Sequence, residues 1–311
     1  MIVLVVCAVL GAAVGSFLNV VIHRLPDPNL SVASPRRSFC PRCKSAIAWY
    51  DNLPILSYFI LLGRCRSCHL PIPLRYLVVE ILTACLFLFF AAAHLPSGDA
   101  SRLTGADLLV LAIQLAVVAA AIAITWIDWD LKIIPDEITL PGCVLLPFLS
   151  ALAPALQDHP YAWTFRQLSA VTSPPIAGYL TATIGELAGM GALLVLVSVF
   201  SRLIPLYWRA LRRMRKAAGQ TTPSDEIPSR VEAMGLGDVK YLALIGAAVG
   251  PEGAFLCFLL ACLVGALVGV VFRFVTGDRE VPFGPFLSVG LIAIMLAGEQ
   301  LIQGFTRFLH G

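Results

Sequence analysis

Long apolar runs constrain what this chain can fold into more than any other feature of its sequence. Several of them approach the length of about 20 residues that an α-helix needs to cross the hydrocarbon core of a bilayer. Hydrophobic residues make up 59% of the sequence and charged residues 13%, whereas a soluble domain carries about 25% charged residues. The sequence therefore predicts an all-α polytopic membrane protein.

We expect eight transmembrane helices, which places both chain ends on one side of the membrane. Lys and Arg concentrate in the loops after the first, third, fifth and seventh runs, and the positive-inside rule assigns those loops to the cytoplasm. Residues 157–185 then form an outer loop without a motif. The net charge of +3 gives no indication of a nucleic-acid partner, and membrane lipid is the expected surrounding. The runs lie near residues 2–22, 77–95, 107–127, 138–156, 187–206, 239–250, 254–274 and 285–303.

The segment between the first two runs is long enough to form a small domain, and it contains two Cys-x-x-Cys pairs. These are Cys40 with Cys43 and Cys65 with Cys68. Four thiolates suit a tetrahedral Zn²⁺, which stabilises loops too small to build a core. A redox or disulfide role is the alternative, although the cytoplasm disfavours disulfides. We therefore divide the chain into a first helix (1–22), a cytoplasmic four-Cys zinc-binding domain (23–76) and a seven-helix membrane domain (77–311), and no internal repeat stands out.

Two acidic residues border apolar runs that are far apart in the chain. Asp238 follows Gly235 and Gly237, and Asp128 ends the third run. Charge at a membrane edge is costly, so it marks a candidate functional site, although Asp238 could instead be the N-cap of a helix. Lys240 could reach outward to the interface or face a cleft beside Asp238. Both acids fall on the cytoplasmic side, which suggests a pair.

Asp128, Asp130 and Asp136 are all candidates for the partner of Asp238. If the third helix continues through residue 130, Asp130 is rotated by about 200° from Asp128, so only one of them can face Asp238. Asp136 follows Pro135, and capping of the next helix explains it. Asp128 lies nearest the membrane interior, and we expect it to form the pair.

Polar residues on the first two runs leave alternatives open. Ser16, Asn19 and His23 share one face of the first helix, where hydrogen bonding between helices is the simplest interpretation. Glu80 lies just inside the second run, and it could either reach the membrane interface or contact a ligand.

Taken together, the motifs resemble those of the type IV prepilin leader peptidases, in their long bacterial form. The resemblance rests on Gly15 to Pro26, on the two Cys pairs with Trp49 to Pro54 between them, on Arg75 to Glu80, on Asp128 with Ile134-Pro135-Asp136, and on Gly235 to Lys240. These motifs span most of the chain. Their family consists of GxGD-type membrane aspartyl proteases that serve pilus assembly and type II secretion.

The resemblance implies a multifunctional enzyme of the bacterial inner membrane with its active site facing the cytoplasm. It implies that Asp128 and Asp238 cut the leader from prepilins or pseudopilins, with Gly235, Gly237 and Lys240 in the active-site loop. It further implies N-methylation of the new N-terminus with S-adenosylmethionine as methyl donor. Glu80 and the first cytoplasmic loop are suspected of a part in methyl transfer.

Two other classes of protein compete with this interpretation. A presenilin-like intramembrane protease shares the Gly-x-Gly-Asp motif, but the four-Cys loop argues against it. An ion-coupled transporter could use membrane carboxylates to carry protons. Transporters usually show paired repeats with interrupted helices, and none is evident here.

Overall fold

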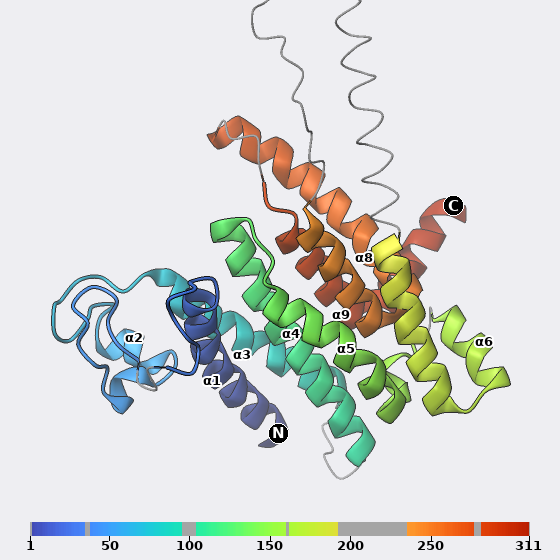
Figure 1. The fold of residues 1–311 in the computed structure, drawn as a ribbon, viewed down its shortest axis with the longest axis horizontal. Coiled ribbons are helices and arrows are strands. Elements are labelled where there is room, and N and C mark those ends of the chain that lie inside the picture. Colours follow the sequence, from blue (N-terminus) through green and yellow to red (C-terminus); the bar gives the residue numbers. More distant parts are fainter. Residues whose placement is uncertain are drawn as a thin grey trace, which may run out of the picture.

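The structure is a computed structural model that describes residues 2–34, 38–94, 104–159, 162–191, 235–276 and 281–310. Within these residues the protein is helical, and the only β-structure consists of isolated bridges. The long helices form one body, and the segment that contains α2 projects from one side of it (Figure 1). The helices are α1 (Ile2–Arg24), α2 (Leu56–Ile60), α3 (Leu74–His94), α4 (Gly105–Leu131), α5 (Asp136–Leu152), α6 (Trp163–Val171), α8 (Leu236–Thr276) and α9 (Gly284–His310), with short 3-10 helices η1 (Trp49–Asn52) and η3 (Pro154–Leu156).

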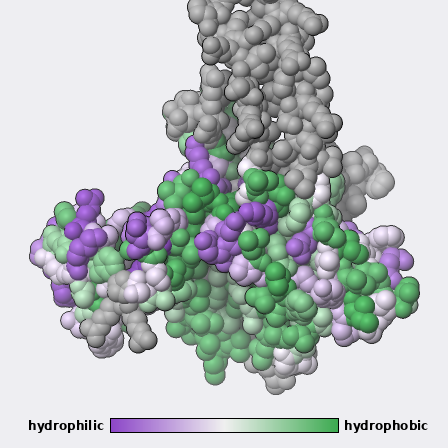
Figure 2. Space-filling model, in the orientation of Figure 1, coloured by the Kyte–Doolittle hydropathy of each residue, from purple (hydrophilic) through white to green (hydrophobic). Residues whose placement is uncertain are grey.

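Five described helices are long and apolar enough to cross a membrane, namely α1, α3, α4, α8 and α9. Hydrophobic side chains cover most of the visible surface of the helical body, while hydrophilic ones gather on the projecting segment (Figure 2). The chain is therefore a multi-pass membrane protein. Helix α5, which corresponds to the expected run at 138–156, has 17 residues. Most of the run expected at 187–206 lies outside the described residues, so the count of eight helices stays a prediction.

Helix α8 consists of two arms that meet at Gly250, where φ is 73° and Pro251 follows. Tyr241 on the first arm contacts Ser288 of α9, and Cys257 on the second arm contacts the adjacent Leu287. In a straight helix these two side chains would lie about 24 Å apart along the axis. The second arm must therefore fold back beside α9. The two arms correspond to the sixth and seventh expected runs.

A helix at residues 174–191 corrects the expected outer loop at 157–185. The hydroxyls of Thr181 and Thr183 made this stretch look too polar for a helix within a membrane. Each hydroxyl donates instead to the carbonyl four residues earlier, at 2.8 and 2.9 Å. Such bonds satisfy a polar side chain inside a helix, and the helix begins at Pro174, a position that proline favours.

Glycines let this helix lie directly against the first arm of α8. A Cβ added to Gly246 would lie 2.0 Å from the carbonyl oxygen of Gly185, and one added to Gly189 would lie 2.5 Å from that of Leu242. Small residues permit such close backbone contact between membrane helices. The helix at 174–191 therefore holds the arm that carries Asp238.

We expect Gly246→Ala to destabilise the protein by about 1–3 kcal/mol, because the backbones must separate to admit the methyl group. Gly269→Ala is the matched control, since an added Cβ on Gly269 meets nothing within 4 Å. Thermal unfolding in detergent should show a lower midpoint for the first variant and little change for the second. Equal midpoints for the two variants would contradict this packing.

Candidate active site and metal centre

Asp128 lies in the last turn of α4 and is 5% exposed. Its Oδ2 accepts a hydrogen bond of 2.9 Å from the backbone N–H of Gly284, at the start of α9. A Cβ on Gly284 would lie 2.6 Å from the same oxygen. Only glycine therefore allows the α9 backbone to hold this carboxylate so closely.

Asp238 lies in the first turn of α8 and is half-buried. Asp238 interacts electrostatically with Asp128, although the two residues are far apart in the sequence. Helix α8 begins at Leu236, before Asp238, so the N-cap interpretation of this aspartate is wrong. A Cβ on Gly237 would lie 3.0 Å from Ile134, so glycine lets α8 start against the α4–α5 turn. Gly235 accepts a 3.2 Å hydrogen bond from the Asp238 N–H.

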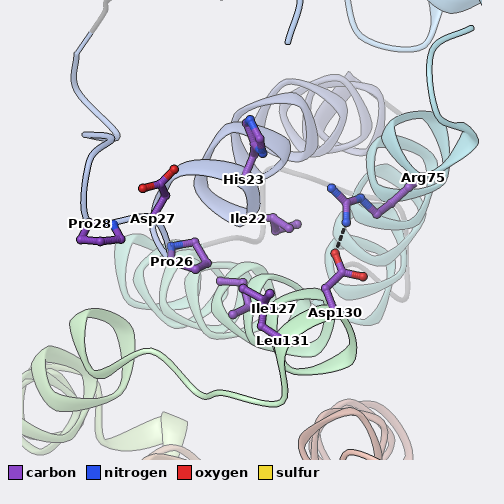
Figure 3. Close-up of a pocket in the computed structure, with 9 residues that line it drawn as sticks. All are labelled: Ile22, His23, Pro26, Asp27, Pro28, Arg75, Ile127, Asp130 and Leu131. Carbon is purple, nitrogen blue, oxygen red and sulfur yellow. Dashed lines mark hydrogen bonds and ion pairs between the residues drawn. The ribbon is translucent and has the colours of Figure 1, made fainter. Parts of the chain in front are cut away.

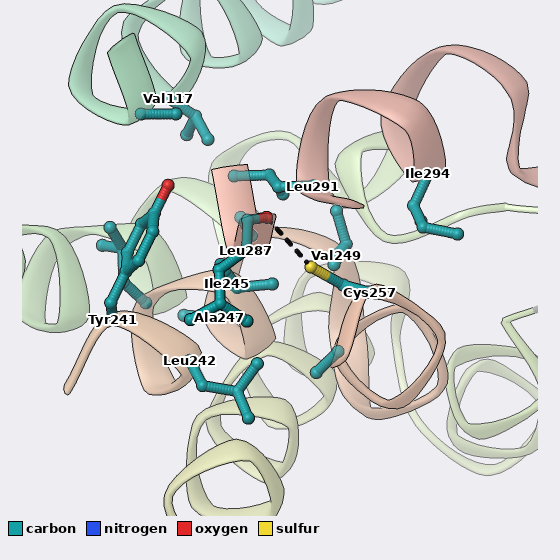
Figure 4. Packing of buried hydrophobic residues seen from close by; sticks show 14 of the residues in the cluster. Val117, Tyr241, Leu242, Ile245, Ala247, Val249, Cys257, Leu287, Leu291 and Ile294 are labelled. Atoms are coloured by element: carbon teal, nitrogen blue, oxygen red, sulfur yellow. Dashed lines mark hydrogen bonds between the residues drawn. The ribbon is translucent and has the colours of Figure 1, made fainter. Parts of the chain in front are cut away.

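A buried polar network that the sequence did not reveal joins the helices of the two aspartates. Tyr241 is fully buried, and its hydroxyl shares a 2.7 Å hydrogen bond with the Ser288 hydroxyl. Ser288 also lies within hydrogen-bond distance of the carbonyls of Ala121, at 3.2 Å, and Gly284, at 3.1 Å. The Tyr241 side chain projects towards α4, beside Val117 (Figure 4). The sequence signal that could have indicated this network is helical spacing. Tyr241 lies three residues after Asp238, and Ser288 lies four residues after Gly284, so the members of each pair share one face of a helix.

The other two acids near the end of α4 have cationic partners. Asp130 is exposed and forms an ion pair with Arg75 of α3, as its rotation away from Asp128 predicts. Asp136 pairs with the Lys240 ammonium at 2.7 Å. One expectation is thereby corrected, because Pro135 is the N-cap of α5 and Asp136 follows it inside the helix. The Lys240 ammonium donates to both carboxylate oxygens of Asp136, which connects α8 to the start of α5.

The four predicted zinc ligands lie together, with all four sulfur atoms within 4.8 Å of one another. The sulfur atoms of Cys40 and Cys68, from different pairs, are 4.0 Å apart. A tetrahedron with Zn–S bonds of about 2.3 Å has edges of about 3.8 Å. The residues therefore fit a zinc ion with little adjustment.

Hydrogen bonds favour the thiolate form of two of the four cysteines, whereas burial and contacts with the other three thiols raise the pKa of Cys68 to about 11. Contacts with Ser45, including its hydroxyl at 2.9 Å, lower the pKa of the Cys43 thiol to about 6. The backbone N–H groups of Cys68 and Ser67 lower the pKa of Cys65. Thiolates are the form that binds metal.

The two Cys pairs have the same backbone hydrogen-bond pattern. In the first, Cys40 N–H donates to Ser45 O and Lys44 N–H to Cys40 O; in the second, Cys65 N–H donates to Leu70 O and His69 N–H to Cys65 O. Lys44 and His69 share a left-handed backbone, with φ of 60° and 56°. Each pair therefore turns its two thiols towards the other.

A cavity of about 450 Å³ lies between the four-Cys domain and helices α1 and α3. Glu80 lines it and is 9% exposed, so its side chain is enclosed by the protein. The Glu80 Oε2 accepts a 2.7 Å hydrogen bond from Ile55 N–H. Ile55 has a φ of 63°, a rare and strained value for a β-branched residue. Glu80 therefore connects α3 to the Trp49–Tyr58 segment, and Asn19 and Ser16 lie on the same cavity wall.

A second cavity, of about 410 Å³, lies between the ends of α1 and α4 and the start of α3. Figure 3 shows Arg75 and Asp130 paired on one side of it and Asp27 on the other. His23 lines both cavities. The second cavity therefore lies between the end of α4, which carries Asp128, and the cavity of Glu80.

Comparison with known proteins gives two family matches. Residues 9–94 match the bacterial peptidase A24 N-terminal domain, and residues 115–270 match the type IV leader peptidase family. Several curated relatives are named prepilin leader peptidase/N-methyltransferase. The relative from Aeromonas hydrophila is 31% identical over 95% of this chain and 91% of its own, and that from Burkholderia pseudomallei (strain 1026b) is 32% identical over 93% and 84%. The one from Pseudomonas aeruginosa is 29% identical over 98% and 94%.

No solved structure gives a significant match. The family matches cover both the four-Cys segment and the helices of the two aspartates. By these matches, and by its identity with relatives along nearly its whole length, the chain belongs to the type IV leader peptidase family.

Proposed function

We propose that this protein cuts the leader from type IV prepilins or type II secretion pseudopilins and then methylates the new N-terminus. The observation that carries the first step is that Asp128, in the last turn of α4, and Asp238, in the first turn of α8, lie close enough to interact electrostatically. The names of the relatives support both activities. We further propose that the protein lies in the bacterial inner membrane with this site facing the cytoplasm, since the basic loops follow the positive-inside rule.

Two neighbouring carboxylates divide the work of peptide hydrolysis between them. They cannot both ionise readily, so one keeps its proton while the other takes a proton from a water between them. That water attacks the peptide carbonyl carbon while the protonated carboxyl donates to the carbonyl oxygen. The C–N bond then breaks, and the leaving amine takes the proton that the other carboxylate removed from the water. The hydrogen bond from Gly284 fixes the Asp128 carboxylate in position for this exchange.

Gly284→Ala tests this positioning, because its methyl group would collide with the Asp128 Oδ2. We expect cleavage to fall by about 10²-fold, the usual cost of displacing a reacting group by about 1 Å. Gly269→Ala is again the control, since it has open space around it. Prepilin cleavage measured by gel shift should separate the two variants, and equal rates would contradict the role of Gly284.

For the second activity we propose that the larger cavity receives S-adenosylmethionine. Its volume, about 450 Å³, lies in the range of small-molecule sites. Tyr50 and Tyr58 supply aromatic surface for a cationic ligand. The ligand would provide an activated methyl group for transfer to an amine.

Zinc bound by Cys40, Cys43, Cys65 and Cys68 would hold the outer wall of this cavity. Cys40 and Cys65 both line the cavity. Arg66, next to Cys65, binds both oxygens of Asp51, at 2.5 and 2.6 Å, and so fixes the Trp49–Tyr58 segment to the second Cys pair. The ion is structural in this proposal, and it takes no part in methyl transfer.

The function is tested by incubating the purified protein with a prepilin and S-adenosylmethionine labelled in its methyl group. We expect a shortened pilin that carries the label on its N-terminal nitrogen. Absence of cleavage would contradict the protease assignment, and a cleaved but unlabelled product would contradict the methyl transfer.

A further inference from the structure

We propose that Asn19 and Glu80 form the binding site for the acceptor amine, the new N-terminus of the cleaved substrate. This inference rests on the proposed methyl transfer and adds the place where the substrate is held. Asn19 is 4% exposed and lines the larger cavity. Its Nδ2 donates to the Tyr76 carbonyl at 3.0 Å, while its Oδ1 is buried without a hydrogen-bond partner among the described residues.

A buried oxygen without a partner is uncommon in native proteins and needs an explanation. Because the Nδ2 contact fixes the orientation of the Asn19 amide, Oδ1 remains as an acceptor. Glu80 adds a carboxylate on the same wall. This wall offers acceptors, which match the N–H groups of an amine.

The depth of this wall in the helices points to the acceptor rather than the methyl donor. Asn19 lies five residues before the end of α1, which corresponds to about 8 Å below that end. Glu80 lies about 9 Å below the start of α3 by the same measure. The N-terminus of an apolar pilin helix reaches this depth within the membrane, whereas a water-soluble donor enters from the side of Arg42 and Arg66, which also line the cavity.

In the transfer itself the amine nitrogen forms a bond to the methyl carbon. The carbon–sulfur bond breaks, and its electron pair goes to sulfur. The nitrogen gives up one proton, which the Glu80 carboxylate can accept. Hydrogen bonding to Asn19 Oδ1 orients the nitrogen lone pair towards the methyl group.

The test uses full-length protein in detergent with a precleaved pilin and labelled S-adenosylmethionine. Asn19→Leu should raise the KM for precleaved pilin about tenfold, the usual effect of one lost hydrogen bond in a binding site. The KM for S-adenosylmethionine and the rate of prepilin cleavage should stay unchanged. Asn19→Gln keeps both an amide donor and an acceptor oxygen and should restore the KM for pilin towards the wild-type value.

Arg42→Gln is the control at a lining residue of the four-Cys domain, and it should leave the KM for pilin unchanged. An unaltered KM for pilin in Asn19→Leu, or an equal rise in the KM for S-adenosylmethionine, would overturn the assignment. Failure of Asn19→Gln to restore the KM would also count against it. If the wild-type protein transfers no methyl group at all, the proposed function itself is wrong, which is a distinct result.

Discussion

Asp128→Asn and Asp238→Asn should each reduce prepilin cleavage by about 10⁴-fold, the upper range for loss of a general acid or base. An asparagine can neither accept the proton of the attacking water nor donate one to the carbonyl oxygen. Methyl transfer to a precleaved pilin should be retained, because the cavity of Glu80 is formed by other elements. Gel shift and label incorporation measure the two activities separately.

Asp130→Asn and Asp136→Asn are the matched controls, since they remove the same charge from nearby positions. Both acids are exposed and pair with cations, Asp130 with Arg75 and Asp136 with Lys240. Exposed ion pairs contribute about 0–1 kcal/mol, so cleavage should be reduced but measurable. Full activity in Asp128→Asn, or complete loss in a folded Asp130→Asn variant, would overturn the choice of catalytic acids.

Removal of the metal should have the second largest effect. Cys40→Ser and Cys65→Ser each leave three thiolates, and binding of structural zinc contributes about 10–16 kcal/mol in small domains that have little other core. We expect both variants to lose zinc, the four-Cys domain to loosen, and methyl transfer to fall to background. Elemental analysis and limited proteolysis check the first two effects.

Cleavage should largely survive in these cysteine variants, because Asp128 and Asp238 lie on membrane helices away from the four-Cys domain. Cys85→Ser is the matched control, since Cys85 is an exposed thiol on α3 that belongs to no metal-binding cluster among the described residues. Purified wild-type protein without zinc would contradict the metal site. Zinc content that persists in Cys40→Ser would contradict the ligand set.

The sequence predicted those features that follow from local composition and spacing. The hydrophobic runs gave α1, α3, α4, α9 and the two arms of α8, and the cysteine spacing gave a cluster whose four sulfur atoms meet. The rotation of about 200° between Asp128 and Asp130 predicted that the two side chains lie on different faces of α4. Asp128 is buried and Asp130 is exposed, in agreement with that prediction.

Features that depend on contacts between distant segments could not be predicted in this way. The hydrogen bond from Gly284 to Asp128 joins residues 156 positions apart. The Tyr241–Ser288 pair was hidden because both residues lie within apolar runs. The helix at 174–191 was missed because its threonines lower the hydropathy of the segment. In the folded protein their hydroxyls are hydrogen-bonded, so their burial carries no desolvation cost.

The central claim is that cleavage and methyl transfer take place at separate sites. Its most direct test is mass spectrometry of one prepilin after incubation with S-adenosylmethionine and each of three proteins. The wild-type protein should yield a cut and methylated pilin, Asp238→Asn an uncut prepilin, and Cys40→Ser a cut pilin without the methyl group. A prepilin cut at the wild-type rate by Asp238→Asn would contradict the aspartate pair as the source of cleavage.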